Sequence, residues 1–290
     1  MTQTINTNLV SLNAQRNMSG SQASLATAMQ RLSSGLRVNS AKDDAAGLAI
    51  AERMTSQVKG MNVAIRNASD GISMAQVAEG ALGKTSDLLQ RMRELAVQSR
   101  NGTNSDSDKD SLDKEFGQLA KEVQRVLAGT TFNNKHIVGS DASTMTFQVG
   151  ANTTGNDTID VKFTNMTTAT SIVSVAGSAD GGVTTSRSSI GSVATTGQIK
   201  TVIDDIDAAI NKINDERASL GATQSRFDAV ISNLQISSEN QSAAKSRIMD
   251  ADFAAETAAL SRAQVLQQAG NAMVAQANQL PQQVLSLLKG

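Results

Sequence analysis

The last part of the chain carries a long run without a charged side chain. No Asp, Glu, Lys or Arg occurs from Ala263 to Leu288, and the frequent Gln and Asn make the run too polar to cross a membrane. Its apolar residues repeat at alternating intervals of three and four: Ala259, Ala263, Leu266, Gly270, Met273, Ala277, Leu280, Val284 and Leu287. This spacing predicts a helix with a heptad seam, large residues alternating with small ones. Such a helix gains little alone in water, so we expect it to be buried against several copies of something similar.

The first forty residues have the same character. They contain three Arg and no acidic residue. The apolar spacing of three and four returns at Ala14, Met18, Ser21, Leu25, Ala28 and Leu32, preceded by Ile5, Leu9 and Leu12. Two matching seams at opposite ends of a chain predict an antiparallel coiled coil between the termini.

The interior predicts further long helices. With six Phe, no Tyr and no Trp, the apolar area must come from many small and aliphatic side chains, as in thin helical bundles. We expect helices from about residue 45 to 67, from 72 to 99 after a join at Asp70–Gly71, and from the acidic start at 105–110 to just before Gly129. From Gln198 a heptad register continues to Leu234, interrupted by Arg217 and Gln224.

Residues 139–197 differ from the rest. Apolar and polar residues alternate over 145–149 and 159–163, which predicts a β-hairpin with a loop at 150–157. The predicted fold is therefore mainly α: long helical hairpins and coiled coils from both termini packed as a rod, with a small β-hairpin region in the middle. The expected domains are a terminal coiled-coil core (1–40 and 246–290), a helical rod domain (41–138 and 198–245) and a Ser/Thr/Gly-rich surface segment (139–197).

Several functional classes find no support. The net charge of −1 offers no basic face for nucleic acid. Cysteine is absent and His136 is the only histidine, so paired-histidine zinc sites are impossible and no Ser-His-Asp arrangement has further support. Asp106, Asp108 and Asp110 alternate like the start of an EF-hand loop, but the required glycine and closing glutamate are missing. We expect no enzyme activity, no metal and no cofactor.

The start of the chain has no basic region followed by an apolar core, so we expect no Sec-type signal peptide. Composition alone is compatible with a soluble cytoplasmic helical protein.

Several long motifs resemble bacterial flagellin. They are Gln3–Asn8, Arg31–Arg37, Asn39–Gly47, Asp70–Ser73, Leu89–Ser99, Ser261–Gln264 and Gln282–Leu288. The resemblance covers roughly residues 1–138 and 198–290 and identifies a short form with a reduced central region.

The resemblance implies a structural subunit that polymerises into the flagellar filament used for motility. The terminal core would form the inner tube and residues from about 41 to 245 the outer tube. The assembly seam would include Leu25, Leu32, Leu266, Met273, Leu280, Val284 and Leu287. Implied partners are further flagellin subunits, an export chaperone that binds the C-terminus, a cap complex and hook–filament junction proteins. Export through the flagellar type III channel would place the chain outside the cell.

A second surface resembles the patch read by the flagellin-sensing Toll-like receptor. The matching residues are Gln90, Arg91, Leu95 and Glu115. The same stretch would also serve as bundle core and subunit contact. Two further classes stay open: a hook–filament junction protein, which has similar terminal arms, and a membrane-acting amphipathic protein. The latter would need a Lys/Arg-rich polar face, which Ala263–Leu288 lacks.

Overall fold

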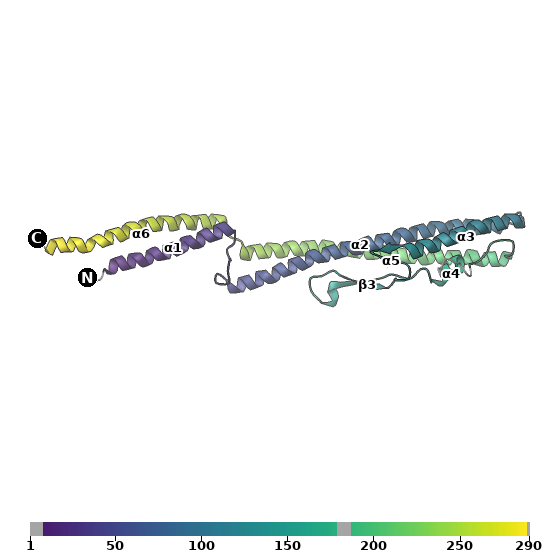
Figure 1. The fold of residues 1–290 in the computed structure, drawn as a ribbon, viewed down its shortest axis with the longest axis horizontal. Helices are drawn as coiled ribbons and strands as arrows, with labels where there is room; N and C mark the ends of the chain where they lie inside the picture. Colours follow the sequence, from purple (N-terminus) through teal and green to yellow (C-terminus); the bar gives the residue numbers. More distant parts are fainter. Residues whose placement is uncertain (1–7, 179–186, 289–290) are drawn as a thin grey trace. The chain divides into compact units, whose positions relative to one another are not determined.

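The structure is a computed structural model that describes residues 8–178 and 187–288, with side chains up to Gln279. In chain order its elements are α1 (Leu9–Ser34), α2 (Ala45–Ser99), α3 (Asp106–Gly129), β1 (Thr131–Phe132), β2 (Lys135–His136), β3 (Thr144–Gln148), a short 3₁₀ turn η1 (Gly155–Asp157), β4 (Thr158–Lys162), α4 (Thr170–Ala176), α5 (Thr196–Met249) and α6 (Phe253–Leu288). The α-helices and β3 are labelled in Figure 1. The mainly helical fold with a small strand region is confirmed.

The chain forms two compact units. Unit 1 comprises residues 1–58 and 239–290, and unit 2 comprises residues 59–238. These divisions differ from the domain boundaries expected near 40 and 245, because the ends of α2 and α5 belong to unit 1. The domain boundaries expected for the filament stay a prediction.

Helix α2 runs without a break through the join expected at Asp70–Gly71, so that prediction was wrong. Gly71 serves packing instead of a turn. A Cβ at this position would lie 2.8 Å from the Phe227 ring of α5. Phe227 also meets Phe147 of β3 edge to face, with 5.5 Å between ring centroids. The glycine therefore lets a helix and a hairpin approach α2 at the same point.

Helix α5 buries the predicted heptad row in unit 2. Its buried residues are Ile199, Val202, Ile206, Ala209, Ile213, Leu220 and Phe227. The two polar interruptions both reach Glu79 of α2. The Gln224 amide donates to Glu79 at 2.9 Å, and the Arg217 guanidinium lies 3.9 Å from the other carboxylate oxygen. The break in the apolar pattern is thus a polar contact between two helices.

Helix α3 begins where the acidic residues predict. The Ser105 side chain accepts from the Asp108 amide, and the Asp108 carboxylate accepts from the Ser105 amide, a capping box. Its buried face carries Phe116, Ala120, Val123 and Leu127. This face joins the core formed with α2 and α5.

The predicted hairpin is confirmed as antiparallel β3 and β4, with Met145 opposite Val161 and Phe147 opposite Ile159. The middle of the chain contributes more to the core than a surface segment would. Val149, Ile159, Val161, Phe163, Met166, Ile172, Val175 and Ile190 are all buried in the core of unit 2. Helix α4 and the two-residue pair β1–β2, whose turn holds Asn133 and Asn134 at positive φ, were not anticipated.

In unit 1 the segment that connects α1 to α2 lies beside the segment that connects α5 to α6, and the two are joined by hydrogen bonds. Leu36 and Asp250 form an antiparallel bridge. The Arg37 amide donates to the Met249 carbonyl at 2.7 Å, and the Ala251 amide donates to the Gly35 carbonyl at 2.9 Å. Gly35 ends α1 in the left-handed conformation, at φ 71°, which permits this sharp exit.

Candidate functional site

Helices α1 and α6 pack antiparallel, as the two seams predict (Figure 1). Near the start of α1, the Asn8 amide donates to the Ala277 carbonyl at 2.7 Å. One turn later the Ser11 hydroxyl donates to the Asn278 side chain at 2.8 Å. Near the end of α1, Arg31 lies 3.8 Å from Glu256. Neutral polar contacts and one ion pair therefore fix the register.

The α1 side of this contact follows the prediction from Ala14 onwards, whereas Leu9 and Leu12, predicted ahead of it, are 68% and 49% exposed, and Ile5 lies outside the described residues. Its buried and half-buried residues include Ala14, Met18, Ser21, Leu25, Ala28 and Leu32. On α6 the small seam residues Ala263 and Ala277 are buried and Gly270 is half-buried. A Cβ at Gly270 would lie 3.6 Å from the Met18 Cβ, which is an ordinary contact. The small positions thus bring the two helices close together.

The large seam positions of α6 do not face α1. Leu266 is 50% exposed and Met273 is 61% exposed, while Gln267 and Val274 are half-buried beside the small residues. Large side chains directly between closely packed backbones would hold the helices apart, so they lie to one side of the contact. The side chains of Leu280, Val284 and Leu287 lie outside the described residues, although the helix continues to Leu288.

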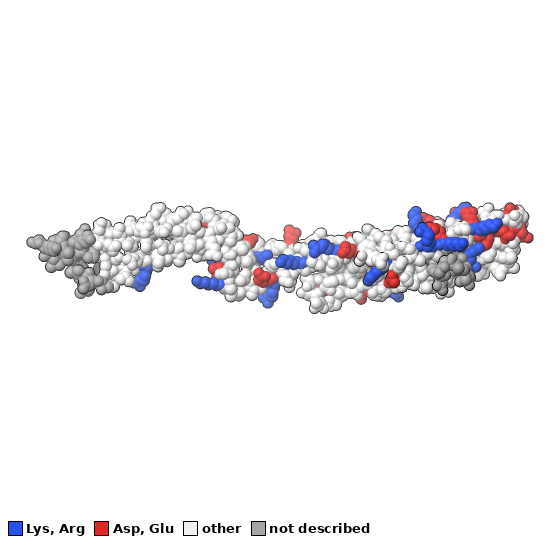
Figure 2. All heavy atoms as spheres, viewed as in Figure 1, with Lys and Arg blue, Asp and Glu red and all other residues white. Residues whose placement is uncertain are grey.

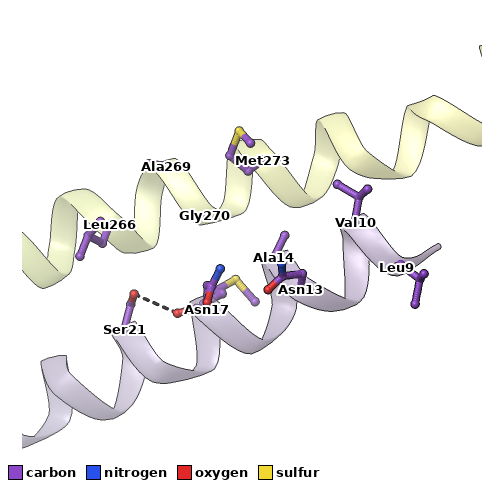
Figure 3. A pocket seen from close by; sticks show the side chains of 11 residues that line it. Leu9, Val10, Asn13, Ala14, Asn17, Ser21, Leu266, Ala269, Gly270 and Met273 are labelled. Atoms are coloured by element: carbon purple, nitrogen blue, oxygen red, sulfur yellow. Dashed lines mark hydrogen bonds between the residues drawn. The ribbon is translucent and has the colours of Figure 1, made fainter. Parts of the chain in front are cut away.

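The displaced large residues line a groove between the two helices, which we call the terminal groove (Figure 3). Its large apolar lining residues are Leu9, Val10 and Met18 of α1 and Leu266 and Met273 of α6. Small and neutral polar residues complete the lining: Asn13, Ala14, Asn17, Ser21, Ala269 and Gly270. The groove holds no charged side chain, so an apolar partner could fill it without desolvating an ion.

Exposed apolar side chains gather on these two helices. Of the fourteen large apolar side chains that are exposed in the described part of the chain, eight belong to α1 or α6. The two helices carry only Arg16, Arg31, Glu256 and Arg262 as charged residues, and the face seen in Figure 2 is almost free of charge along them. Val10 and Val265 were not predicted, because neither belongs to the single heptad seam. Neighbouring apolar residues such as Val265 and Leu266 were the signal for a wider apolar surface.

The second candidate surface, on α2 and α3 of unit 2, is held by ion pairs. The Arg91 guanidinium contacts Glu115 of α3 at 2.8 Å and Glu94 at 2.9 Å. The hydrogen bond to Glu115, and to a smaller extent the one to Glu94, raises the pKa of Arg91 above its ordinary value. Gln90, Arg91 and Glu115 are exposed.

Leu95, expected on the same surface, is instead fully buried. It lies on the apolar face of α2 together with Leu89 and Met92, and its side chain belongs to the core. A shallow hollow beside Arg91 is lined by Gln90, Arg93, Glu94, Val97 and Gln98, and half-exposed Val97 is its apolar member.

Within residues 8–178 and 187–288 no group of three or more His, Cys, Asp or Glu is placed to hold a metal ion. His136 is half-buried, and its Nδ1 lies 2.6 Å from the Ala128 carbonyl at the end of α3. None of the described helices is both long and apolar enough to cross a bilayer.

Comparison with known proteins agrees with these features. The model of the bacterial flagellin N-terminal helical region matches residues 5–143, and that of the C-terminal helical region matches residues 203–288. Flagellin of Halalkalibacterium halodurans is 43% identical, with 98% of this chain and 99% of that protein covered. Flagellin of Xenorhabdus nematophila is also 43% identical, with both chains fully covered.

The crystal structure of Bacillus cereus flagellin covers 58% of this chain and 88% of its own, at 30% identity and a TM-score of 0.48. The two family models together span well over half of the chain, and the relatives match it along nearly its whole length. The chain therefore belongs to the bacterial flagellin family, whose members are structural subunits of the flagellar filament and not enzymes.

Proposed function

We propose that the chain polymerises by burying its terminal groove, and the exposed apolar residues around it, against further copies of itself. The observation that carries this proposal is the exposure of Leu9, Val10, Leu266 and Met273 on helices that have almost no charge. Burying the exposed part of each side chain would contribute about 1 kcal/mol. Several such contacts per subunit would add up to a stable polymer.

The charge distribution favours a second copy over other occupants. A helix that lies on a membrane surface usually has a polar face rich in Lys and Arg, and α6 has only Arg262. A copy of the same helices brings few charges to desolvate and little repulsion between like charges. Extensive similarity to flagellins over both terminal regions also favours a filament subunit over a junction protein.

The terminal pair is weak by itself. Among the described residues of α1 and α6 only Ser11, Ala28, Ala263 and Ala277 are fully buried. Helices gain most of their stability from packing of an apolar face, and here much of that face is open. We therefore expect α1 and α6 to be largely disordered in the free subunit and to fold as copies assemble, when burial offsets the entropy of ordering.

A single substitution tests the groove. We expect Leu266→Asp to block polymerisation, because assembly would bury an unpaired carboxylate at a cost of several kcal/mol. The measurement is sedimentation of polymer after seeding with native fragments, with circular dichroism to verify that the helices of unit 2 remain. Leu280→Asp should have the same effect.

Val193→Asp is the matched control, since Val193 is 85% exposed and lies in unit 2. This variant should polymerise like the wild type. Normal filaments from Leu266→Asp would overturn the proposed role of the groove. An equal loss of polymerisation in Leu266→Asp and Val193→Asp would overturn it as well. Liposome flotation of the wild type separates assembly from membrane binding.

We also propose that Gln90, Arg91 and Glu115 are read by the flagellin-sensing Toll-like receptor. In support, the three are exposed and Glu115 and Glu94 hold the Arg91 guanidinium in place. Leu95 would act from the core, by supporting the helix that presents Arg91. Arg91→Ala should reduce signalling in a receptor reporter assay. A silent wild type would end this proposal, and Lys84→Ala, an exposed charge on the same helix, serves as control.

The remaining partners follow from family membership. We propose export through the flagellar type III channel, escort by a chaperone that binds the C-terminus, and assembly beneath a cap on hook–filament junction proteins, so that the chain serves outside the cell. Retention of the protein in cells with the export channel deleted tests the route.

A further inference from the structure

The turn between α2 and α3 contains the one Asn-Gly pair of the sequence, Asn101–Gly102. Both residues are exposed and lie outside the helices. We infer that Asn101 is a site of spontaneous deamidation, which converts it to aspartate and isoaspartate in the folded protein. This inference concerns a covalent modification and is independent of how the chain assembles.

The reaction needs only the chain and water. The deprotonated Gly102 amide nitrogen attacks the Asn101 side-chain carbonyl carbon, the new C–N bond closes a succinimide, and the side-chain nitrogen leaves as ammonia. Water then adds to either imide carbonyl. Opening on one side restores the normal backbone as aspartate, and opening on the other routes the backbone through the side chain as isoaspartate.

The structure leaves both reacting groups free. In the described part of the chain the Gly102 amide donates to no protein acceptor. The Asn101 carboxamide accepts only a long bond, 3.5 Å, from the Thr103 amide. Open space surrounds Gly102, since a Cβ there would meet nothing within 4 Å. Ring closure therefore faces little steric or hydrogen-bonding resistance.

Comparable asparagines are protected by their neighbours. After Asn104, the Ser105 amide donates to the Asp108 carboxylate at 3.0 Å, within the capping box of α3. After Asn39, the Ser40 amide donates to the Asp43 carboxylate at 2.9 Å. When a carboxylate accepts a hydrogen bond from a backbone amide, the amide nitrogen retains its proton. The N–H then also points away from the preceding asparagine side chain. These hydrogen bonds thus disfavour the reaction at Asn39 and Asn104, whereas the amide after Asn101 has no such acceptor.

Modification would disturb the turn. The Asn101 carbonyl accepts from the Asn104 amide at 3.2 Å, and the Asn104 side chain donates to the Gln98 carbonyl at 2.7 Å. An isoaspartate adds a carbon to the main chain between these anchors. A new carboxylate would also lie close to the C-terminal carbonyls of α2, where negative charge is unfavourable.

The test is peptide mass mapping of the full chain during incubation in mildly alkaline buffer, combined with labelling by an isoaspartyl methyltransferase. The expected result is conversion at Asn101 ahead of Asn39 and Asn104. Gly102→Ala should cause loss of most of this conversion. The glycine has no positive φ and has free space beside it, so alanine should fit without strain.

A second variant tests the protection. Asp108→Ala frees the Ser105 amide and should raise conversion at Asn104 while leaving Asn101 unchanged. In urea, the preference for Asn101 over Asn104 should shrink. Equal rates at the two sites in the folded wild type, an unchanged rate in Gly102→Ala, or no gain at Asn104 in Asp108→Ala would each overturn the inference.

Discussion

Asp113 of α3 anchors the segment that leads into α5. Its carboxylate accepts from the Arg187 guanidinium at 2.6 and 3.0 Å, from the Ser189 hydroxyl at 3.0 Å and from the Ile190 amide at 2.8 Å. The Arg187 side chain also lies over the Phe116 ring, 6.0 Å from its centroid. The pair is largely sheltered, with side-chain exposures of 18% for Asp113 and 23% for Arg187. The Asp113 carboxylate therefore binds three groups of one segment, Arg187, Ser189 and Ile190, which lies far from Asp113 in the sequence.

Replacing this carboxylate should destabilise unit 2 in a pH-dependent way. Burial raises the pKa of Asp113, but the Arg187 and Ile190 hydrogen bonds and the Arg187 charge outweigh it, so the pKa lies below its ordinary value of 3.8. Stability from a lowered pKa is present above the ordinary value and is lost as the pH falls through the folded one. Asp113→Asn should therefore lower the free energy of unfolding by about 1–3 kcal/mol near neutral pH and by less in strong acid.

Urea unfolding at several pH values measures this difference. Asp87→Asn, an exposed carboxylate on α2, is the control and should change little. A constant difference between Asp113→Asn and wild type from neutral pH down to strong acid would contradict the explanation.

At the scale of the elements, α2 and α5 are set in register by Glu79. Arg217 and Gln224 are seven residues apart on α5 and converge on this one carboxylate. A polar contact within an apolar seam costs stability but specifies which positions meet. The contact thus explains why the heptad pattern of α5 contains two polar residues.

A double-mutant cycle tests this contact. Glu79→Ala and Gln224→Ala should each destabilise unit 2, and the two losses should be non-additive by about 0.5–1.5 kcal/mol, because either change alone removes the bond. Denaturant unfolding of the wild type, both single variants and the double variant gives the coupling. Additive losses would show that the two residues do not interact; Glu79→Ala with Thr201→Ala, on an exposed face of α5, should be additive.

How far the sequence predicts each element depends on the range of the interaction that fixes it. The heptad of α5, the acidic start of α3 and the β3–β4 hairpin depend on neighbours in sequence, and all three were predicted; the capping box at that start was not. The unbroken course of α2 at Gly71 depends on Phe227, far along the chain, and periodicity cannot reveal that contact. The exposure of Leu266 was missed for a similar reason, because a heptad pattern does not say which of two apolar rows faces the partner helix.

At the scale of the whole molecule, the two units differ in how much apolar surface they bury. Unit 2 has a continuous apolar core formed by α2, α3, α5 and the middle segment. The terminal pair in unit 1 has few fully buried residues and a large exposed apolar surface. Stability therefore resides mainly in unit 2, and the proposed assembly surface lies on α1 and α6.

Removing both terminal helices tests this division. A chain limited to residues 45–249 should unfold cooperatively, because it keeps the core of unit 2, and should remain monomeric where the full chain polymerises. Calorimetry and analytical ultracentrifugation measure the two properties. Fibres of native diameter from the shortened chain would refute the role of the terminal helices, and removal of residues 179–186 alone should leave polymerisation intact.

The two connecting segments that are hydrogen-bonded at Leu36 and Asp250 have a mechanical consequence. A single strand between two helices can swivel about its backbone bonds, whereas two strands joined by hydrogen bonds cannot rotate separately. We therefore expect a rotation of α1 about this point to be accompanied by a rotation of α6.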